Sequence, residues 1–178
     1  VTQGKITFRL GEGRSAEIYV ADYDGANAVA VTSDKVLVSA PTWVPGQRKL
    51  FYVSYKSGFP DILSHDLTTG ARDRFAKFGG GNYSPAVSPD GRRVAMILSK
   101  TGNPELFVCN IDGSGLKQLT KTKESESSPC WSPDGGTICF VSKMSGRAGL
   151  YKINADGGTP QRIKTAGVGG NLTEPDWS

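Results

Sequence analysis

Hydrophobic residues recur along this chain at an interval of 44 residues, and this repeat is its main sequence feature. Some recurring positions lie two residues apart, so in an extended strand their side chains point to one face. No helical period competes, and each repeat therefore predicts several short β-strands. The recurring sets are Ile6, Leu50, Val94 and Ile138; Phe8, Tyr52, Met96 and Phe140; Ile18, Ile62, Leu106 and Leu150; and Val31, Phe75, Leu119 and Ile163.

A proline-rich phrase opens each repeat and supplies its first strand. Pro41, Pro85 and Pro129 begin the phrase, which ends in Pro-Gly or Pro-Asp-Gly, residues typical of a tight turn. A shorter copy, Glu174-Pro-Asp-Trp-Ser, ends the chain. We name the strands of a repeat a to d in chain order. Strand a is marked by Trp43, Val87, Trp131 and, with a shift, Trp177.

Repeats of this length, built from short strands, predict an all-β fold, a β-propeller of four-stranded antiparallel blades. One domain over residues 1–178 is expected, with about four blades at 1–36 (strands b, c and d), 37–80, 81–124 and 125–168. A lone strand a at 172–178 is expected to close the ring by pairing beside residues 5–10. The alternative is that the chain forms part of a larger ring.

Composition adds limits on partners and compartment. The net charge is +4, and no basic cluster alternates with aromatic residues, so no nucleic-acid partner is expected. No apolar run is long enough for membrane insertion. Val1 is not an initiator methionine, which suggests a processed chain and leaves export open. Of the three cysteines, Cys130 and Cys139 flank one turn; they are either a disulfide across a hairpin or small buried residues.

Candidate chemistry is sparse, and no catalytic residue, metal site or cofactor is predicted. The single histidine, His65, shares its repeat position with alanine, cysteine and isoleucine, which favours a structural role. No Gly-x-Ser-x-Gly nucleophile motif occurs. Asp90 and Asp134 belong to the Pro-Asp-Gly turns, where a carboxylate bonds its own backbone. The recurring tryptophans are interpreted as packing residues between blades.

The phrase Ser-Pro-Asp-Gly, with Ile18-Tyr-Val-Ala-Asp-Tyr-Asp-Gly and Tyr151-Lys-Ile-Asn-Ala-Asp-Gly-Gly, resembles the TolB-type β-propeller (PD40) repeat family. The resemblance covers essentially the whole chain. It implies a six-bladed ring, of which about four blades are present here. It also implies a periplasmic or otherwise exported protein of the Tol–Pal cell-envelope system, whose partner is the peptidoglycan-associated lipoprotein Pal. The α/β domain that precedes the propeller in this family is absent from the chain.

Binding residues are expected in the d–a loops, because these depart from the repeat while the a–b and c–d turns are nearly identical. By resemblance, the segments just before the strand-a prolines face the partner. The predicted partner-binding residues are Asn82, Tyr83, Ser84, Glu126, Ser127, Ser128, Asn171, Thr173 and Glu174. The leading hypothesis is a non-catalytic module that binds a protein or peptide, by resemblance a Pal-like lipoprotein. The alternatives are the gating propeller of a prolyl-oligopeptidase-type serine peptidase and a bare scaffold.

Overall fold

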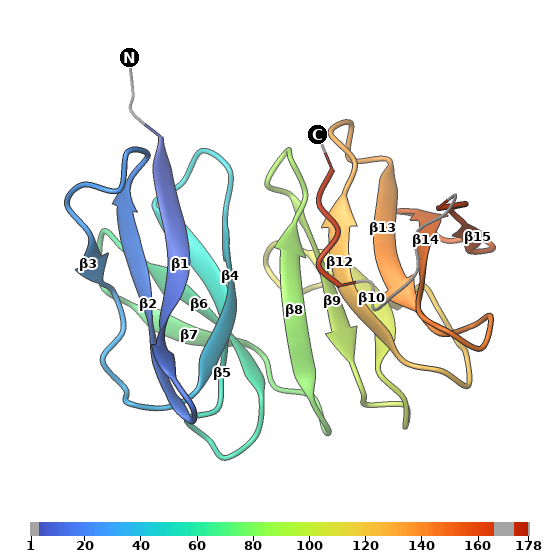
Figure 1. Cartoon of the computed structure of the whole chain (residues 1–178), viewed down its shortest axis with the longest axis horizontal. Helices are drawn as coiled ribbons and strands as arrows, with labels where there is room; N and C mark the ends of the chain where they lie inside the picture. The colour runs from blue at the N-terminus through green and yellow to red at the C-terminus, as the bar shows by residue number, and fades with distance from the viewer. Residues whose placement is uncertain (1–3, 166–172, 178) are drawn as a thin grey trace.

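The computed structural model describes residues 4–165 and 173–177 and contains four antiparallel sheets, arranged side by side as blades (Figure 1). The predicted all-β propeller fold is confirmed. The first sheet has three strands, β1 (Lys5–Glu12), β2 (Ser15–Asp22) and β3 (Val29–Ala30). The second has four, β4 (Val38–Trp43), β5 (Lys49–Ser54), β6 (Asp61–Asp66) and β7 (Arg72–Ala76).

The third and fourth sheets repeat the second. They consist of β8 (Asn82–Val87), β9 (Arg93–Leu98), β10 (Glu105–Asn110) and β11 (Lys117–Gln118), and of β12 (Glu126–Trp131), β13 (Thr137–Ser142), β14 (Gly149–Asn154) and β15 (Gln161–Arg162). Strand a of a blade is therefore β4, β8 or β12, and strand b is β1, β5, β9 or β13. In the part of the chain that is described, no helix is long and apolar enough to cross a membrane.

The core lies between neighbouring sheets, because one sheet cannot cover both of its own faces. Strands b of the complete blades are almost fully buried, and Leu50, Val94 and Ile138 are each 0% exposed. Leu106 in strand c of the third blade is also 0% exposed, as its place in a hydrophobic set predicts. The 44-residue period thus specifies which faces pack together.

Strands β4, β8 and β12 each contain a bulge that was not predicted from the sequence. The register of β4, β8 and β12 against the adjacent strand b shifts across the repeated proline, between Ser39 and Thr42, between Tyr83 and Ala86, and between Ser127 and Cys130. At these bulges Ala40, Ser84 and Ser128 have φ of 49°, 47° and 50°. A positive φ is unfavourable for a residue with a Cβ, so the neighbouring pairing must hold this geometry in place.

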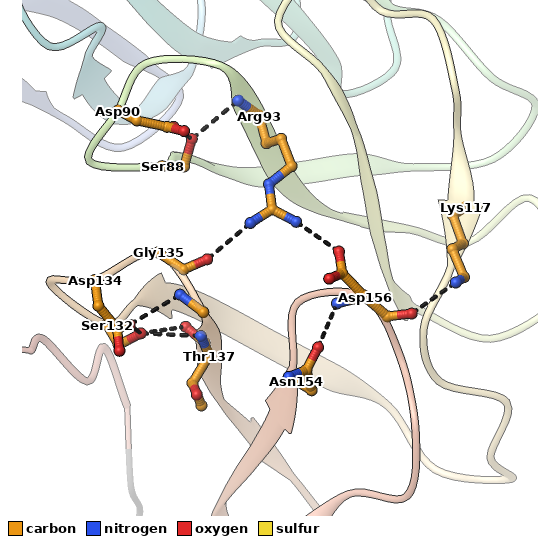
Figure 2. A network of polar contacts seen from close by, with 11 residues as sticks. Ser88, Asp90, Arg93, Lys117, Ser132, Asp134, Gly135, Thr137, Asn154 and Asp156 are labelled. Atoms are coloured by element: carbon orange, nitrogen blue, oxygen red, sulfur yellow. Dashed lines mark hydrogen bonds and ion pairs between the residues drawn. The ribbon is translucent and has the colours of Figure 1, made fainter.

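The a–b and c–d turns form one end of the blades, which we call the Asp-turn face. It comprises residues 23–28, 44–48, 67–71, 88–92, 111–116, 132–136 and 155–160. Asp90 accepts hydrogen bonds from Ser88 Oγ at 2.5 Å and from the Arg92 amide at 3.0 Å. Asp134 does the same with Ser132 and Gly136 (Figure 2). The predicted structural role of these turn aspartates is confirmed.

Closure through Trp177 is not observed. Residues 173–177 form no strand, and β1 pairs only with β2 among the described residues. Figure 1 shows the C-terminal segment running beside β12, the strand that carries Cys130. Glu174 has φ of 49°, the value found at the other bulges. The segment therefore follows β12 in the position of another strand a, instead of turning back to residues 5–10.

Candidate functional site

The d–a and b–c loops meet at the other end of the blades, which we call the variable-loop face. It comprises residues 13–14, 31–37, 55–60, 77–81, 99–104, 119–125, 143–148 and 163–165. Backbone hydrogen bonds join the two kinds of loop. The Asn82 amide donates to Pro60 O at 3.0 Å, and the Glu126 amide donates to Pro104 O at 2.9 Å. The scaffold therefore fixes these loops as one surface.

This face is strongly basic. Its segments contain two acids, Asp34 and Glu124. Asp34 forms ion pairs with Lys56 at 2.7 Å and with Arg72 at 2.5 Å. Burial is the largest single influence on the pKa of the Asp34 carboxyl group and raises it, but the two cations together outweigh burial, so the pKa is lowered. Every lysine and arginine of the face is exposed, namely Arg14, Lys35, Lys56, Lys77, Lys100, Lys121, Lys123, Lys143, Arg147 and Lys164.

The Asp-turn face has the opposite balance. Its segments contain two arginines, Arg48 and Arg92, against the aspartates of the turns. The exposed aspartates are Asp24, Asp90, Asp112, Asp134 and Asp156. The loops at the two ends of the blades therefore differ in charge, since those of the variable-loop face carry mostly cations and those of the Asp-turn face mostly aspartates. A protein with an acidic surface would approach the variable-loop face first.

One large apolar side chain protrudes from this basic surface. Phe59, in the loop between β5 and β6, is 70% exposed. Nearby, Lys100 Nζ lies 4.5 Å from the centroid of the Phe78 ring, which holds the lysine across the junction of two blades. Sequence reasoning missed Phe59. The sequence did contain a signal, because the equivalent positions of the next two repeats hold the polar residues Asn103 and Arg147, whereas this repeat has an aromatic residue.

Two of the predicted binding residues are buried. Asn82 is 0% exposed, and its side chain bonds the Phe78 amide and the carbonyl oxygens of Phe78 and Pro60, each at 3.1 Å. Glu126 is 1% exposed and accepts hydrogen bonds from Thr122 and Ser142. Both side chains stabilise the loops from beneath, so neither offers surface to a partner.

The other predicted residues stay near the surface. Tyr83, Ser84 and Ser128 are partly exposed, and Ser127 is exposed at the start of β12. Tyr83 also packs against the core between the third and fourth sheets. Thr173 and Glu174 are exposed, while Asn171 lies outside the described residues. The accessible members thus border the variable-loop face, together with Phe59.

His65 and the cysteine pair are structural. His65 is 5% exposed within β6, and burial lowers the pKa of its imidazole. Cys130 and Cys139 lie opposite each other in β12 and β13, and both are free thiols. The disulfide alternative is therefore not observed. A hydrogen bond with Cys139, assisted by burial, raises the pKa of Cys130, which makes it a poor nucleophile.

Comparison with known proteins agrees with this architecture. The "Tol-Pal system protein TolB" of Haemophilus ducreyi is 42% identical over 79 residues, which are 44% of this chain and 18% of that protein. The "Protein TolB homolog" of Chlamydia felis is 33% identical over 97 residues, which are 50% of this chain and 23% of that protein. These matches span about a fifth of each relative.

Solved structures show the same fold. TolB from Acinetobacter baumannii matches 92% of this chain and 42% of its own, with a TM-score of 0.80 and 28% identity. A puromycin-hydrolysing peptidase of Mycobacterium tuberculosis has a TM-score of 0.68 over 92% of this chain and 30% of its own, but 18% identity, which shows the fold alone. The family model described as "TolB beta propeller domain" matches residues 3–178, and the chain therefore belongs to the TolB β-propeller domain family.

Proposed function

We propose that the chain is a non-catalytic interaction module that binds a protein partner over its variable-loop face. The observation that carries this proposal is the exposed Phe59 within a surface whose cations face solvent while its acids are few. A protruding aromatic ring surrounded by charged groups is the usual composition of a binding hot spot and its rim. The rigid blades beneath keep this surface in shape without a partner.

The relatives indicate which partner to test. A protein named for the Tol–Pal system aligns with 44% of this chain at 42% identity, and the family resemblance implies a periplasmic setting and the lipoprotein Pal. We therefore propose a Pal-like lipoprotein as the partner, with an acidic contact surface that matches the basic loops. The peptidase alternative has weaker support, because the peptidase neighbour resembles this chain in fold alone.

The proposal is tested by calorimetric titration of the chain with the soluble domain of a peptidoglycan-associated lipoprotein. Phe59→Ala should weaken binding about tenfold or more, as for a hot-spot residue. Tyr83→Ala and Ser127→Arg should weaken it as well. Melting curves of each variant separate a binding loss from unfolding, which matters most for the partly buried Tyr83.

The matched control is Arg92→Glu on the Asp-turn face, since this side chain is exposed and its backbone alone takes part in the turn. Arg92→Glu should leave binding within about twofold of the unchanged chain. Loss of binding in Arg92→Glu but not in Phe59→Ala would refute the proposed face. Hydrolysis of a peptide substrate by the chain itself would refute the non-catalytic role.

A further inference from the structure

Two carboxyl groups meet directly beneath the variable-loop face, between the third and fourth blades. Glu105 begins β10 and Glu126 begins β12, and both residues are almost fully buried. Thr120 Oγ1 lies within hydrogen-bonding distance of both side chains, and the two carboxyl groups are within reach of each other. Two carboxylates this close in a buried site repel each other strongly, so the pair is stable when it shares one proton.

The polar groups that face this pair are neutral. They are hydroxyl groups of the 119–125 loop and of β13, namely Thr120, Thr122 and Ser142. Among the described residues, no lysine, arginine or histidine forms an ion pair with either carboxyl group. The charged side chains of the loop are exposed, namely Lys121, Lys123 and Glu124. The bound proton is therefore what neutralises the second carboxyl group.

The same pair holds the backbone of the 119–125 loop, which belongs to the variable-loop face. The Thr122 amide donates to Glu105 Oε1 at 2.7 Å, and Thr122 Oγ1 lies 3.0 Å from Glu126 Oε1. Asn103 Nδ2 donates to the Thr122 carbonyl oxygen at 3.1 Å. One residue of the loop is thus bonded to both carboxyl groups, and the position of the loop depends on how the two side chains lie.

The repeat shows that packing alone does not require a carboxyl group at Glu126. The equivalent positions one and two repeats earlier hold Asn82 and Val38, and both are buried. Asn82 accepts a hydrogen bond from the Phe78 amide through its side-chain oxygen, so an amide can hold the corresponding loop without titrating. The buried carboxyl pair therefore distinguishes this blade junction from the two before it.

We propose that the Glu105–Glu126 pair is a proton-dependent latch, which holds the 119–125 loop in the shape that binds the protein partner. The inference rests on the proposed function, since the loop carries part of the basic surface assigned to that partner. With the proton bound, both side chains stay in place and bond the loop. When the proton is lost, the two carboxylates separate, Thr122 loses a bond to one of them, and the exposed lysines on either side of it move.

The direction of the pH effect follows from the raised pKa of Glu126, which is about 8. The latch is closed while the proton is bound, so partner affinity is highest below this pKa and falls as pH rises through it. Glu126→Gln supplies a permanent amide donor to Glu105 and keeps an acceptor for Thr122. This variant should hold the loop at every pH.

Hydrogen exchange tests the latch without a partner. In the unchanged chain, protection of the Thr122 amide, corrected for the intrinsic exchange rate, should fall about fivefold or more between about pH 6 and about pH 9. In Glu126→Gln it should stay constant. Glu124→Gln is the matched control from the same loop and should lose protection as the unchanged chain does. Constant protection in the unchanged chain, or an equal loss in Glu126→Gln, would overturn the latch.

Calorimetric titration with the soluble domain of a peptidoglycan-associated lipoprotein tests the link to binding. The dissociation constant should rise about fivefold or more between about pH 6 and about pH 9 for the unchanged chain, and clearly less for Glu126→Gln. The same partner is used for both chains, so its own titration cancels in the comparison. Equal pH dependence in both would overturn the link between latch and binding. No binding at any pH, with the exchange result as expected, would refute the proposed partner and not the latch.

Discussion

The carboxyl groups of Glu105 and Glu126 meet in the buried junction between the third and fourth blades. Thr120 Oγ1 lies 2.7 Å from Glu105 and 3.3 Å from Glu126, and the two carboxyl groups are themselves within hydrogen-bonding reach. Both residues are at most 2% exposed. Burial, followed by the contact with Glu105, raises the pKa of Glu126 to about 8. The junction therefore holds a proton at neutral pH.

Replacement of this proton-binding group should change the pH dependence of stability. A carboxyl group with a raised pKa in the folded chain contributes its full stability below about pH 4.5, and the contribution is lost as pH rises toward about 8. Glu126→Gln supplies a permanent amide donor to Glu105 and keeps an acceptor for Thr122 and Ser142. It should increase the free energy of unfolding by about 2–4 kcal/mol at pH 8 and flatten its slope between pH 5 and 8.

Urea unfolding from pH 4 to pH 9 measures this effect. Glu124→Gln is the control, since Glu124 is exposed two residues away and should leave the slope unchanged. An unaltered slope in Glu126→Gln would show that the carboxyl pair does not hold a proton in the folded chain.

A second prediction concerns Arg93, which joins the third and fourth blades at the Asp-turn face (Figure 2). Its guanidinium donates to Asp156 Oδ1 at 2.9 Å and to Gly135 O at 2.8 Å, and lies 4.9 Å from the centroid of the Trp131 ring. The Asp156 side chain is 86% exposed, so that ion pair contributes little. Packing on the indole and the bond to the carbonyl should dominate.

We therefore expect Arg93→Ala to lower the free energy of unfolding by about 1–2 kcal/mol and Asp156→Ala by less than about 0.5 kcal/mol. Chemical denaturation of the two variants gives the comparison. Equal losses would mean that the ion pair, and not the packing, holds the blades together here.

The fold could be predicted from the sequence because hydrophobic residues at buried positions recur with the period of the repeat. Leu106 and Val94 recur at fixed intervals since each occupies the same place between adjacent sheets. The tight turns could be predicted as well, and Asp90 accepts a hydrogen bond within its own turn as expected. These features depend on contacts that every repeat shares.

Features of single blades were harder to predict. Asn82 and Glu126 begin strands β8 and β12, next to loops whose composition suggested surface, but their side chains turn inward and bond buried polar groups. Phe59 looked like loop sequence, and its exposure depends on where the loop projects. The predicted pairing of the Trp177 segment with residues 5–10 is not observed among the described residues, and the phrase around Trp177 is the same whether the segment continues the row of blades or closes it. The repeat phrase identifies a segment as a strand a, but it does not determine which strand that segment pairs with.

The predicted hydrophobic core is tested by Leu106→Ala. Leu106 is fully buried between strands of the third and fourth sheets, so its truncation leaves a cavity. The free energy of unfolding should fall by about 2–5 kcal/mol. Leu10→Ala is the control, since Leu10 is 56% exposed on β1 and should cost less than about 0.5 kcal/mol. A loss in Leu106→Ala as small as in the control would contradict the strand assignment.

The last prediction uses the charge polarity of the two faces. Lys121 is exposed on the variable-loop face and Arg48 is exposed on the Asp-turn face, so reversal of either changes the net charge equally. If the lipoprotein partner approaches the basic loops, Lys121→Glu should slow association severalfold at low salt and by much less at about 150 mM salt, where charges beyond about 8 Å are screened. Arg48→Glu should have a smaller effect because it lies at the far end of the blades. Association rates measured by stopped flow over a salt series make the comparison, and equal slowing in both variants would mean that net charge, and not this face, guides the partner.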